Sequence, residues 1–176
     1  MNLLASTLAL EIISLNPREI EYYIRTKLLK NLVKNLGDAK PQIRKTSHYC
    51  LLTYVKTYKS FDELIPSYAS YGLNSPDWQL RQKSINSFQS ILIMEMKYLN
   101  WGSGEFRKIF ELMLARLKDE SQYVRKASEQ CLLSLCKIDE IRSFSKKLQS
   151  SSFMALREFC EAQKEMGNLQ EIKIEI

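Results

Sequence analysis

The sequence predicts an all-α protein built from antiparallel pairs of helices that repeat along the chain. One observation is a pattern of leucine, turn, apolar residue, arginine and small residue that is present three times among 176 residues. Another is the spacing of the apolar residues, which follows the helical period of about 3.6 residues. A third is composition, because 5 glycines and 4 prolines leave little room for a β-rich fold full of tight turns.

Each copy of the pattern has a leucine seven residues before an apolar anchor, and arginine follows the anchor directly. The copies begin at Leu36, Leu73 and Leu117 and reach Ile43-Arg44, Leu80-Arg81 and Val124-Arg125. The arginines are 37 and then 44 residues apart, about the period of a two-helix HEAT repeat. Repeats of this kind stack into an α-solenoid that binds partners along an extended surface. The pattern therefore predicts a HEAT-type α-solenoid with a binding role.

Local signals define the helices of the first repeat. Asn16-Pro17 is typical of a helix start, and Gly37 is a natural residue just beyond the end of that helix. Pro41 opens the second helix, whose expected buried residues are Ile43, Ser47, Cys50, Leu51, Tyr54 and Val55. Residues 1–15 are apolar and are expected to form a packing helix, since they lack the basic start of a signal peptide.

Similar signals define the later helices. Ser60 and Glu63 have the spacing of a capping box at the start of a third helix. Pro76 is expected to open a longer helix that runs to about Leu99. The third copy predicts a helix over 105–117 and a second one with Val124, Ala127, Cys131, Leu132 and Leu135 on its buried side.

These elements predict one solenoid domain over residues 1–167, followed by a tail at 168–176. Clear repeats are expected at about 20–57, 61–99 and 105–137, with an irregular helical cap at 139–167.

The composition favours a binding protein over an enzyme. The formal net charge of +6 is typical either of a protein with an acidic partner or of a soluble surface with a modest basic bias. His48 is the only histidine, and there is no phosphate-binding glycine motif. We therefore expect no catalytic residues, no metal and no cofactor, with His48 in a structural role.

Cysteine usage and hydropathy predict a cytoplasmic protein. Cys50 and Cys131 take the same core position in two copies of the pattern, and no CxxC motif is present among the four cysteines. Unpaired core cysteines are typical of a reducing compartment. No apolar run reaches the roughly 18 residues that a membrane-spanning helix needs.

The turns inside the repeats hold the candidate binding residues. Because a short connection makes neighbouring helices antiparallel, the three turns are expected to line up along one edge of the stack. The candidate partner-binding residues of this row are Trp78, Lys40, Arg44, Lys45, Arg81, Lys118, Tyr123, Arg125 and Lys126.

Some of these residues also have a structural interpretation. The repeated arginines can bond a turn carboxylate or carbonyl of the neighbouring repeat, with Asp38 and Asp119 as natural partners and Ser75 at that position in the second copy. Trp78 either inserts into a partner as a hot spot or packs over the start of its helix. Trp101, which precedes a glycine-containing loop, is expected to anchor local packing.

At these residues the sequence resembles a TOG domain, the tubulin-binding HEAT array of microtubule regulators. The stretch Asp77-Trp78-Gln79-Leu80-Arg81 is similar to the tryptophan-bearing turn of that family, and 38–44 and 119–125 are similar to its later basic turns. Residues 71–88 look closest to the crescerin proteins of cilia, which carry TOG arrays. The resemblance covers about residues 30–137, with three clear repeats where a TOG domain usually has about six.

The resemblance implies a non-catalytic, monomeric module that binds tubulin or microtubules and regulates their dynamics, in the cytoplasm and cytoskeleton and in cilia. Trp78 would insert against one tubulin subunit, and the basic turn residues would contact acidic surface.

Two other functions stay open from the sequence. One is a HEAT-repeat adaptor that binds a peptide or helix of a partner protein in the groove of the second helices, although no regular row of Tyr or Asn marks that groove. The other is nucleic-acid binding. The absence of a run of five or six basic residues in the sequence argues against it.

Overall fold

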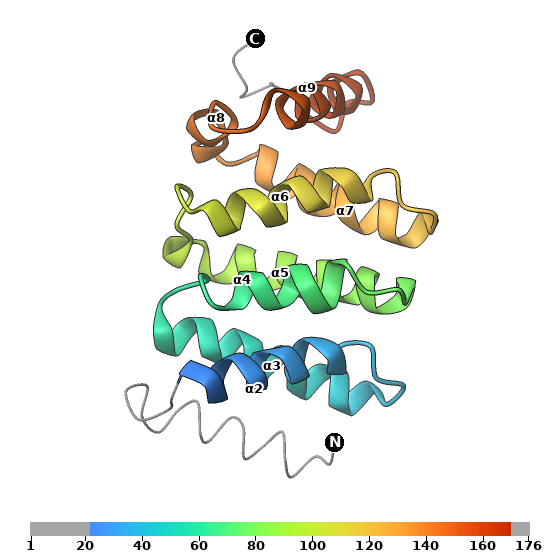
Figure 1. Ribbon diagram of the computed structural model, residues 1–176. Coiled ribbons are helices and arrows are strands. Elements are labelled where there is room, and N and C mark those ends of the chain that lie inside the picture. The colour runs from blue at the N-terminus through green and yellow to red at the C-terminus, as the bar shows by residue number, and fades with distance from the viewer. Residues whose placement is uncertain (1–21, 170–176) are drawn as a thin grey trace. The chain divides into compact units, whose positions relative to one another are not determined.

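The computed structural model describes residues 22–169 as an all-α protein, and no strand is present in that range (Figure 1). Contacts between residues divide the chain into two compact units, Met1–Asn100 (unit 1) and Trp101–Ile176 (unit 2). The prediction of one solenoid domain over 1–167 stays a prediction. The expected packing helix at 1–15, the helix start at Asn16-Pro17 and most of the tail lie outside the described residues.

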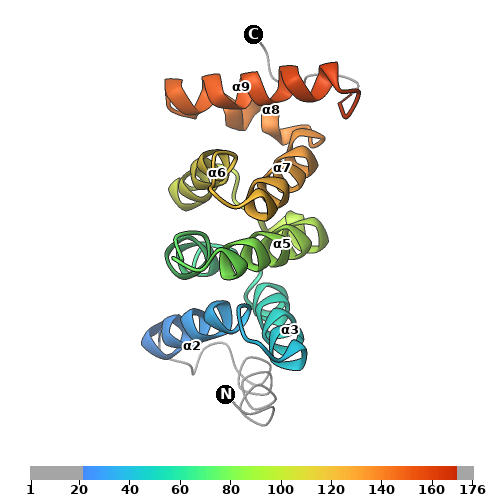
Figure 2. The same cartoon turned by 90° about the vertical axis from the view of Figure 1, so that its right-hand side faces the viewer.

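Unit 1 contains two layers of helices. Its described residues form α2 (Tyr22–Asn35), α3 (Pro41–Tyr58), α4 (Leu64–Ser67), the π-helix η1 (Tyr68–Leu73), α5 (Trp78–Glu95) and the 3-10 helix η2 (Met96–Tyr98). α2 packs against α4 and η1 in one layer, and α3 packs against α5 in the other (Figures 1 and 2). Contacts of α2 with α3 and of η1 with α5 join the layers.

The apolar pattern of the second helices is confirmed in unit 1. The predicted buried residues of α3 are all in its core: Ile43, Ser47, Cys50, Leu51, Tyr54 and Val55. In α5, Ser84, Ser87, Phe88 and Ile91 are buried, whereas the anchor Leu80 is only partly buried.

The capping box expected at Ser60 and Glu63 is wrong. The helix begins at Leu64, four residues later than Ser60. The Ser60 hydroxyl accepts a hydrogen bond from the Asp62 amide at 3.1 Å, and the Glu63 carboxylate accepts one from the Tyr54 hydroxyl. Glu63 is therefore drawn to a tertiary partner instead of closing a local cap.

The start of α5 also differs from the expected position, since the helix begins at Trp78 and not at Pro76. Asp77 is the N-cap, and its Oδ1 accepts the Gln79 amide at 2.9 Å. The cap satisfies one of the amides that a helix start leaves without an intrahelical partner. As a result, Trp78 is the first residue of the helix.

Two glycines allow close packing inside unit 1. Gly37 does not take the left-handed conformation expected beyond a helix end. Instead, a Cβ on Gly37 would lie 3.2 Å from the Leu80 Cβ, and a Cβ on Gly72 would lie 2.7 Å from the Ser84 Cβ. Glycine is therefore needed where the first turn and η1 approach α5.

Unit 2 contains α6 (Gly104–Arg116), α7 (Gln122–Cys136), α8 (Glu140–Ser145) and α9 (Ser150–Glu165) among its described residues. α6 packs against α7 and α9. The expected buried residues of the third copy, Val124, Ala127, Cys131, Leu132 and Leu135, are all buried. Left-handed Gly167, with a φ of 75°, ends α9.

Trp101 anchors local packing in unit 2, as predicted. Its ring centroid lies 5.2 Å from that of Phe106 and 6.0 Å from that of Phe144, in edge-to-face arrangements. Across residues 22–169, none of the helices combines the length and the apolar character needed to cross a membrane.

Candidate functional site

The repeated arginine closes its own turn in unit 1. Arg44 Nη1 donates to the main-chain carbonyls of Asp38 and Ala39, both at 2.8 Å. Arg81 Nη1 makes the equivalent bonds to the carbonyls of Ser75 and Pro76, at 2.9 and 3.0 Å. Each arginine therefore ties the first turn of its helix to the connection that precedes it.

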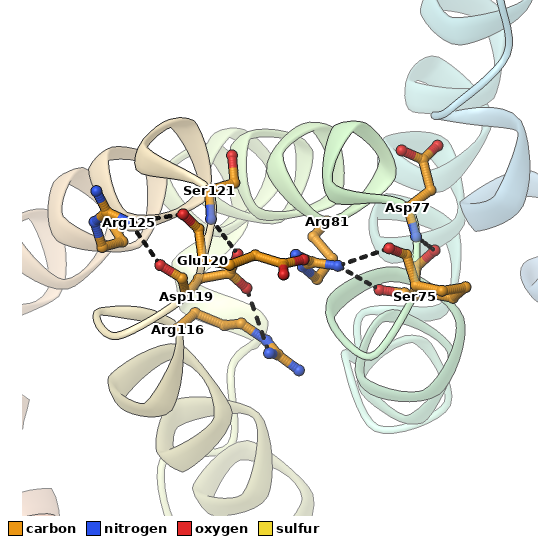
Figure 3. Close-up of polar contacts among 9 residues, drawn as sticks. Ser75, Asp77, Arg81, Arg116, Asp119, Glu120, Ser121 and Arg125 are labelled. Atoms are coloured by element: carbon orange, nitrogen blue, oxygen red, sulfur yellow. Dashed lines mark hydrogen bonds and ion pairs between the residues drawn. The ribbon is translucent and has the colours of Figure 1, made fainter.

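Unit 2 contains the same arrangement. Arg125 Nη1 donates to the carbonyls of Asp119 and Glu120 at 2.7 and 2.9 Å (Figure 3). The sequence predicted acceptors in the neighbouring repeat, whereas the carbonyl acceptors belong to the turn of the same repeat. Since they are main-chain atoms, serine at position 75 serves as well as aspartate at 38 and 119.

The side chain of that same turn residue has a second role in every copy. Asp38 Oδ1 accepts the Lys40 amide at 2.8 Å. Ser75 Oγ accepts the Asp77 amide at 3.1 Å, and Asp119 Oδ1 accepts the Ser121 amide at 3.0 Å. Short Asp and Ser side chains form local turns of this kind. The leucine-to-arginine pattern thus encodes one turn geometry in both units.

The predicted binding residues differ in how much surface they offer. Arg81 is 5% exposed and Arg44 is partly buried, so both mainly hold their turns. The remaining residues are exposed: Lys40, Lys45, Trp78, Lys118, Tyr123, Arg125 and Lys126. Trp78 is 36% exposed and Tyr123 is 52% exposed, so aromatic surface is available at a turn in each unit.

The first two turns belong to unit 1, and the third belongs to unit 2. Lys40, Lys45 and Trp78 all belong to unit 1, where a Cβ on Gly37 of the first turn would lie 3.2 Å from the Leu80 Cβ of α5. Lys118, Tyr123 and Lys126 belong to unit 2. The row of three turns along one edge therefore stays a prediction.

The second helices of the first two copies, α3 and α5, form a groove in unit 1; the sequence named such a groove only for the adaptor alternative and did not identify its lining residues. It is a shallow, open groove of about 450 Å³, lined in part by Arg44, Lys45, His48, Tyr49, Lys83 and Asn86. Tyr49 and Asn86 are both exposed and both lie five residues after the repeated arginine. This shared offset is the signal that could have revealed the groove, although only two such residues are present in unit 1.

The wall of this α3–α5 groove is tied to the core by hydrogen bonds. His48 Nδ1 lies 2.8 Å from Ser87 Oγ, which lies 2.7 Å from the hydroxyl of fully buried Tyr68. Burial lowers the pKa of His48 below its ordinary value of 6.5. His48 is therefore neutral at pH 7, in agreement with the structural role expected for it.

Unit 2 has a cavity of similar size, about 450 Å³, near its own turn. Its lining combines two cations, Lys118 and Arg125, with two carboxylates, Glu129 and Glu158. The Glu129 carboxylate accepts a hydrogen bond from Gln163 Nε2 at 2.8 Å. This cavity therefore has charges of both signs.

All four cysteines are buried thiols without disulfides, as expected for Cys50 and Cys131 from their repeat positions. Burial raises the pKa of Cys50 to about 11 and that of Cys131 to about 12. In residues 22–169, no three His, Cys, Asp or Glu side chains gather closely enough to hold a metal ion.

No family model matches this sequence, and comparison with curated proteins finds no similar protein. The function therefore has to be inferred from the turns and grooves themselves.

Proposed function

We propose that this chain is a HEAT-type α-solenoid of antiparallel helix pairs that binds tubulin or microtubules through its turns, in the manner of a TOG domain. The observation that carries the proposal is the turn geometry, which is built three times with an arginine that spans two carbonyls. A turn held so firmly presents its neighbouring side chains with little loss of conformational freedom on binding.

The side chains around these turns fit an acidic protein partner. Lys40 and Lys45 are exposed in the first turn of unit 1, and Lys118 and Lys126 are exposed in unit 2. Trp78 adds partly exposed aromatic surface at the start of α5. Interfaces of this kind combine an aromatic hot spot with complementary charge, and tubulin is acidic. The proposed activity is non-catalytic regulation of microtubule dynamics.

The first experiment is size-exclusion chromatography of the chain with soluble αβ-tubulin at low ionic strength. We expect co-elution of the parent chain and loss of co-elution for a Trp78→Ala, Lys126→Ala variant. Lys126 is preferred to Arg125 here because Arg125 holds its own turn. Circular dichroism of each variant verifies that the helices are retained.

A matched control replaces an exposed apolar residue and an exposed lysine away from the turns. Met94→Ala, Lys147→Ala meets this condition, since Met94 is 60% exposed late in α5 and Lys147 is exposed between α8 and α9. The control should co-elute like the parent. Absence of a complex with the parent chain at tens of micromolar, where weak specific complexes are still detected, would contradict the proposal.

A further inference from the structure

The α3–α5 groove of unit 1 is positively charged. Arg44, Lys45 and Lys83 line it, and no carboxylate does. Arg44 Nη1 is engaged by the carbonyls of its turn. Within residues 22–169, neither Lys45 nor Lys83 takes part in an ion pair. Two ammonium groups are thus available to a ligand that lies in the groove.

The helices around the groove reinforce this positive charge. α2 and α3 contain no acidic residue, and Glu95 is the only one in α5. Glu95 is 7% exposed and faces Lys56 and Lys97 at 3.7 and 4.0 Å. Glu95 is the last residue of α5, whereas Lys83 lies near the start of that helix. The Glu95 carboxylate therefore does not neutralise the groove.

The remaining lining fits a polypeptide better than a bare anion. Tyr49 is 60% exposed and offers an aromatic face to an apolar side chain. Asn86 offers both a donor and an acceptor, which match the amide and carbonyl groups of a peptide backbone. The His48–Ser87–Tyr68 hydrogen bonds hold the wall, so the groove is formed before a ligand binds.

We propose that the α3–α5 groove binds an acidic peptide segment of a partner protein, with Lys45 and Lys83 contacting carboxylates and Tyr49 and Asn86 contacting the peptide between them. Charge complementarity carries this proposal, together with the mixed aromatic and amide lining. It does not depend on tubulin binding by the turns.

The test is fluorescence anisotropy with a short fluorescein-labelled peptide of alternating glutamate and leucine, at low ionic strength. Lys83→Glu should weaken binding by about tenfold or more, and Lys83→Gln, which removes only the charge, should weaken it by a smaller factor. Tyr49→Ala should also weaken it. A peptide with glutamine in place of glutamate should bind poorly, and added salt should release the acidic peptide.

Lys59→Glu is the matched control because it makes the same charge change in unit 1. Lys59 is exposed and follows the last residue of α3, roughly 20 Å along the helix from Lys45. It should change the affinity by less than about twofold. Equal effects of Lys59→Glu and Lys83→Glu would overturn the proposal, as would equal binding of the glutamine peptide.

Further experiments distinguish binding of an acidic peptide in this groove from binding of other partners. A short labelled oligothymidylate that binds more tightly than the peptide, with the same dependence on Lys83, would reassign the groove to nucleic acid and overturn the proposal. The Trp78→Ala, Lys126→Ala variant should lose tubulin co-elution and keep its peptide affinity. Tyr49→Ala should weaken peptide binding and keep tubulin co-elution. Failure of the groove and failure of the turn proposal can therefore be told apart.

Discussion

The two units contain the same turn but differ in charge. Both use an arginine that donates to two consecutive carbonyls, with a short side chain that accepts an amide two residues later. Unit 1 has 13 basic and 8 acidic residues, a net charge of +5, whereas unit 2 has 13 and 12, a net charge of +1. The repeat pattern thus preserves backbone geometry while the exposed positions are free to vary.

The cavities show the consequence of that freedom. The groove of unit 1 is lined by cations without a carboxylate, and the cavity of unit 2 pairs two cations with two carboxylates. A common repeat therefore does not imply a common ligand. The residues between the shared turn positions of the pattern set the charge of each cavity.

The largest difference in stability between the units is expected when one glycine in each unit is replaced by alanine. Gly72→Ala would place a Cβ 2.7 Å from the Ser84 Cβ, and Gly104→Ala would meet nothing within 4 Å. We expect Gly72→Ala to lower the free energy of unfolding by about 2 kcal/mol through overpacking, and Gly104→Ala to leave it unchanged or slightly raised. Urea denaturation measures both. Equal effects would contradict the close packing of η1 on α5.

The next prediction compares how much one repeated arginine from each unit contributes to stability. Arg81→Ala should cost about 2 kcal/mol, because Arg81 is 5% exposed and its loss leaves turn carbonyls without their charged donor. Arg125→Ala should cost about 1 kcal/mol, since Arg125 is exposed and water can replace it. Thermal or urea unfolding of the single variants measures which substitution lowers the free energy of unfolding more. A larger decrease for Arg125→Ala than for Arg81→Ala would contradict this interpretation.

Replacing one buried serine in each unit is expected to have a smaller effect on stability, and the same effect in both units. Ser84 and Ser128 are fully buried at the same repeat position, and neither hydroxyl has a hydrogen-bond partner. Alanine at either position should leave stability unchanged or raise it by about 0.5–1 kcal/mol, because an unsatisfied hydroxyl is removed and alanine favours helix. Valine at the same positions is the control and should destabilise through its larger volume. A clear loss with alanine would show that the hydroxyl is needed.

The smallest effect is a pH dependence confined to unit 1. Burial lowers the folded-state pKa of His48 below 6.5, so the unfolded chain binds its proton more readily. This contribution to stability is complete above pH 6.5 and falls as the pH drops toward the folded pKa. Stability measured between pH 7 and 5 should fall more for the parent than for His48→Gln. Parallel curves would contradict the prediction.

Several features of the fold followed from local sequence. Pro41 opens α3 because proline suits the first turn of a helix, and the buried residues of α3 and α7 follow the helical spacing of apolar side chains. Other features did not follow. The Ser60–Glu63 signal failed because Tyr54 of another helix competes for the Glu63 carboxylate, a contact that local spacing does not contain.

The candidate site divides in the same way. The leucine-to-arginine pattern marked the turns because the arginine's acceptors lie five and six residues before it, within the repeat itself. The lining of the α3–α5 groove was missed because Tyr49 and Asn86 lie 37 residues apart in the sequence. They line one groove only after α3 and α5 pack.

By itself, the sequence determined the helical class, the positions of the three leucine-to-arginine turns and most buried residues of the second helices, since these depend on contacts within a few residues. Only the tertiary structure decided the burial of Arg81, the close approach that requires Gly72, and the positive groove between α3 and α5. These features depend on which helix faces lie against each other, and that arrangement minimises the exposed apolar surface of unit 1 as a whole.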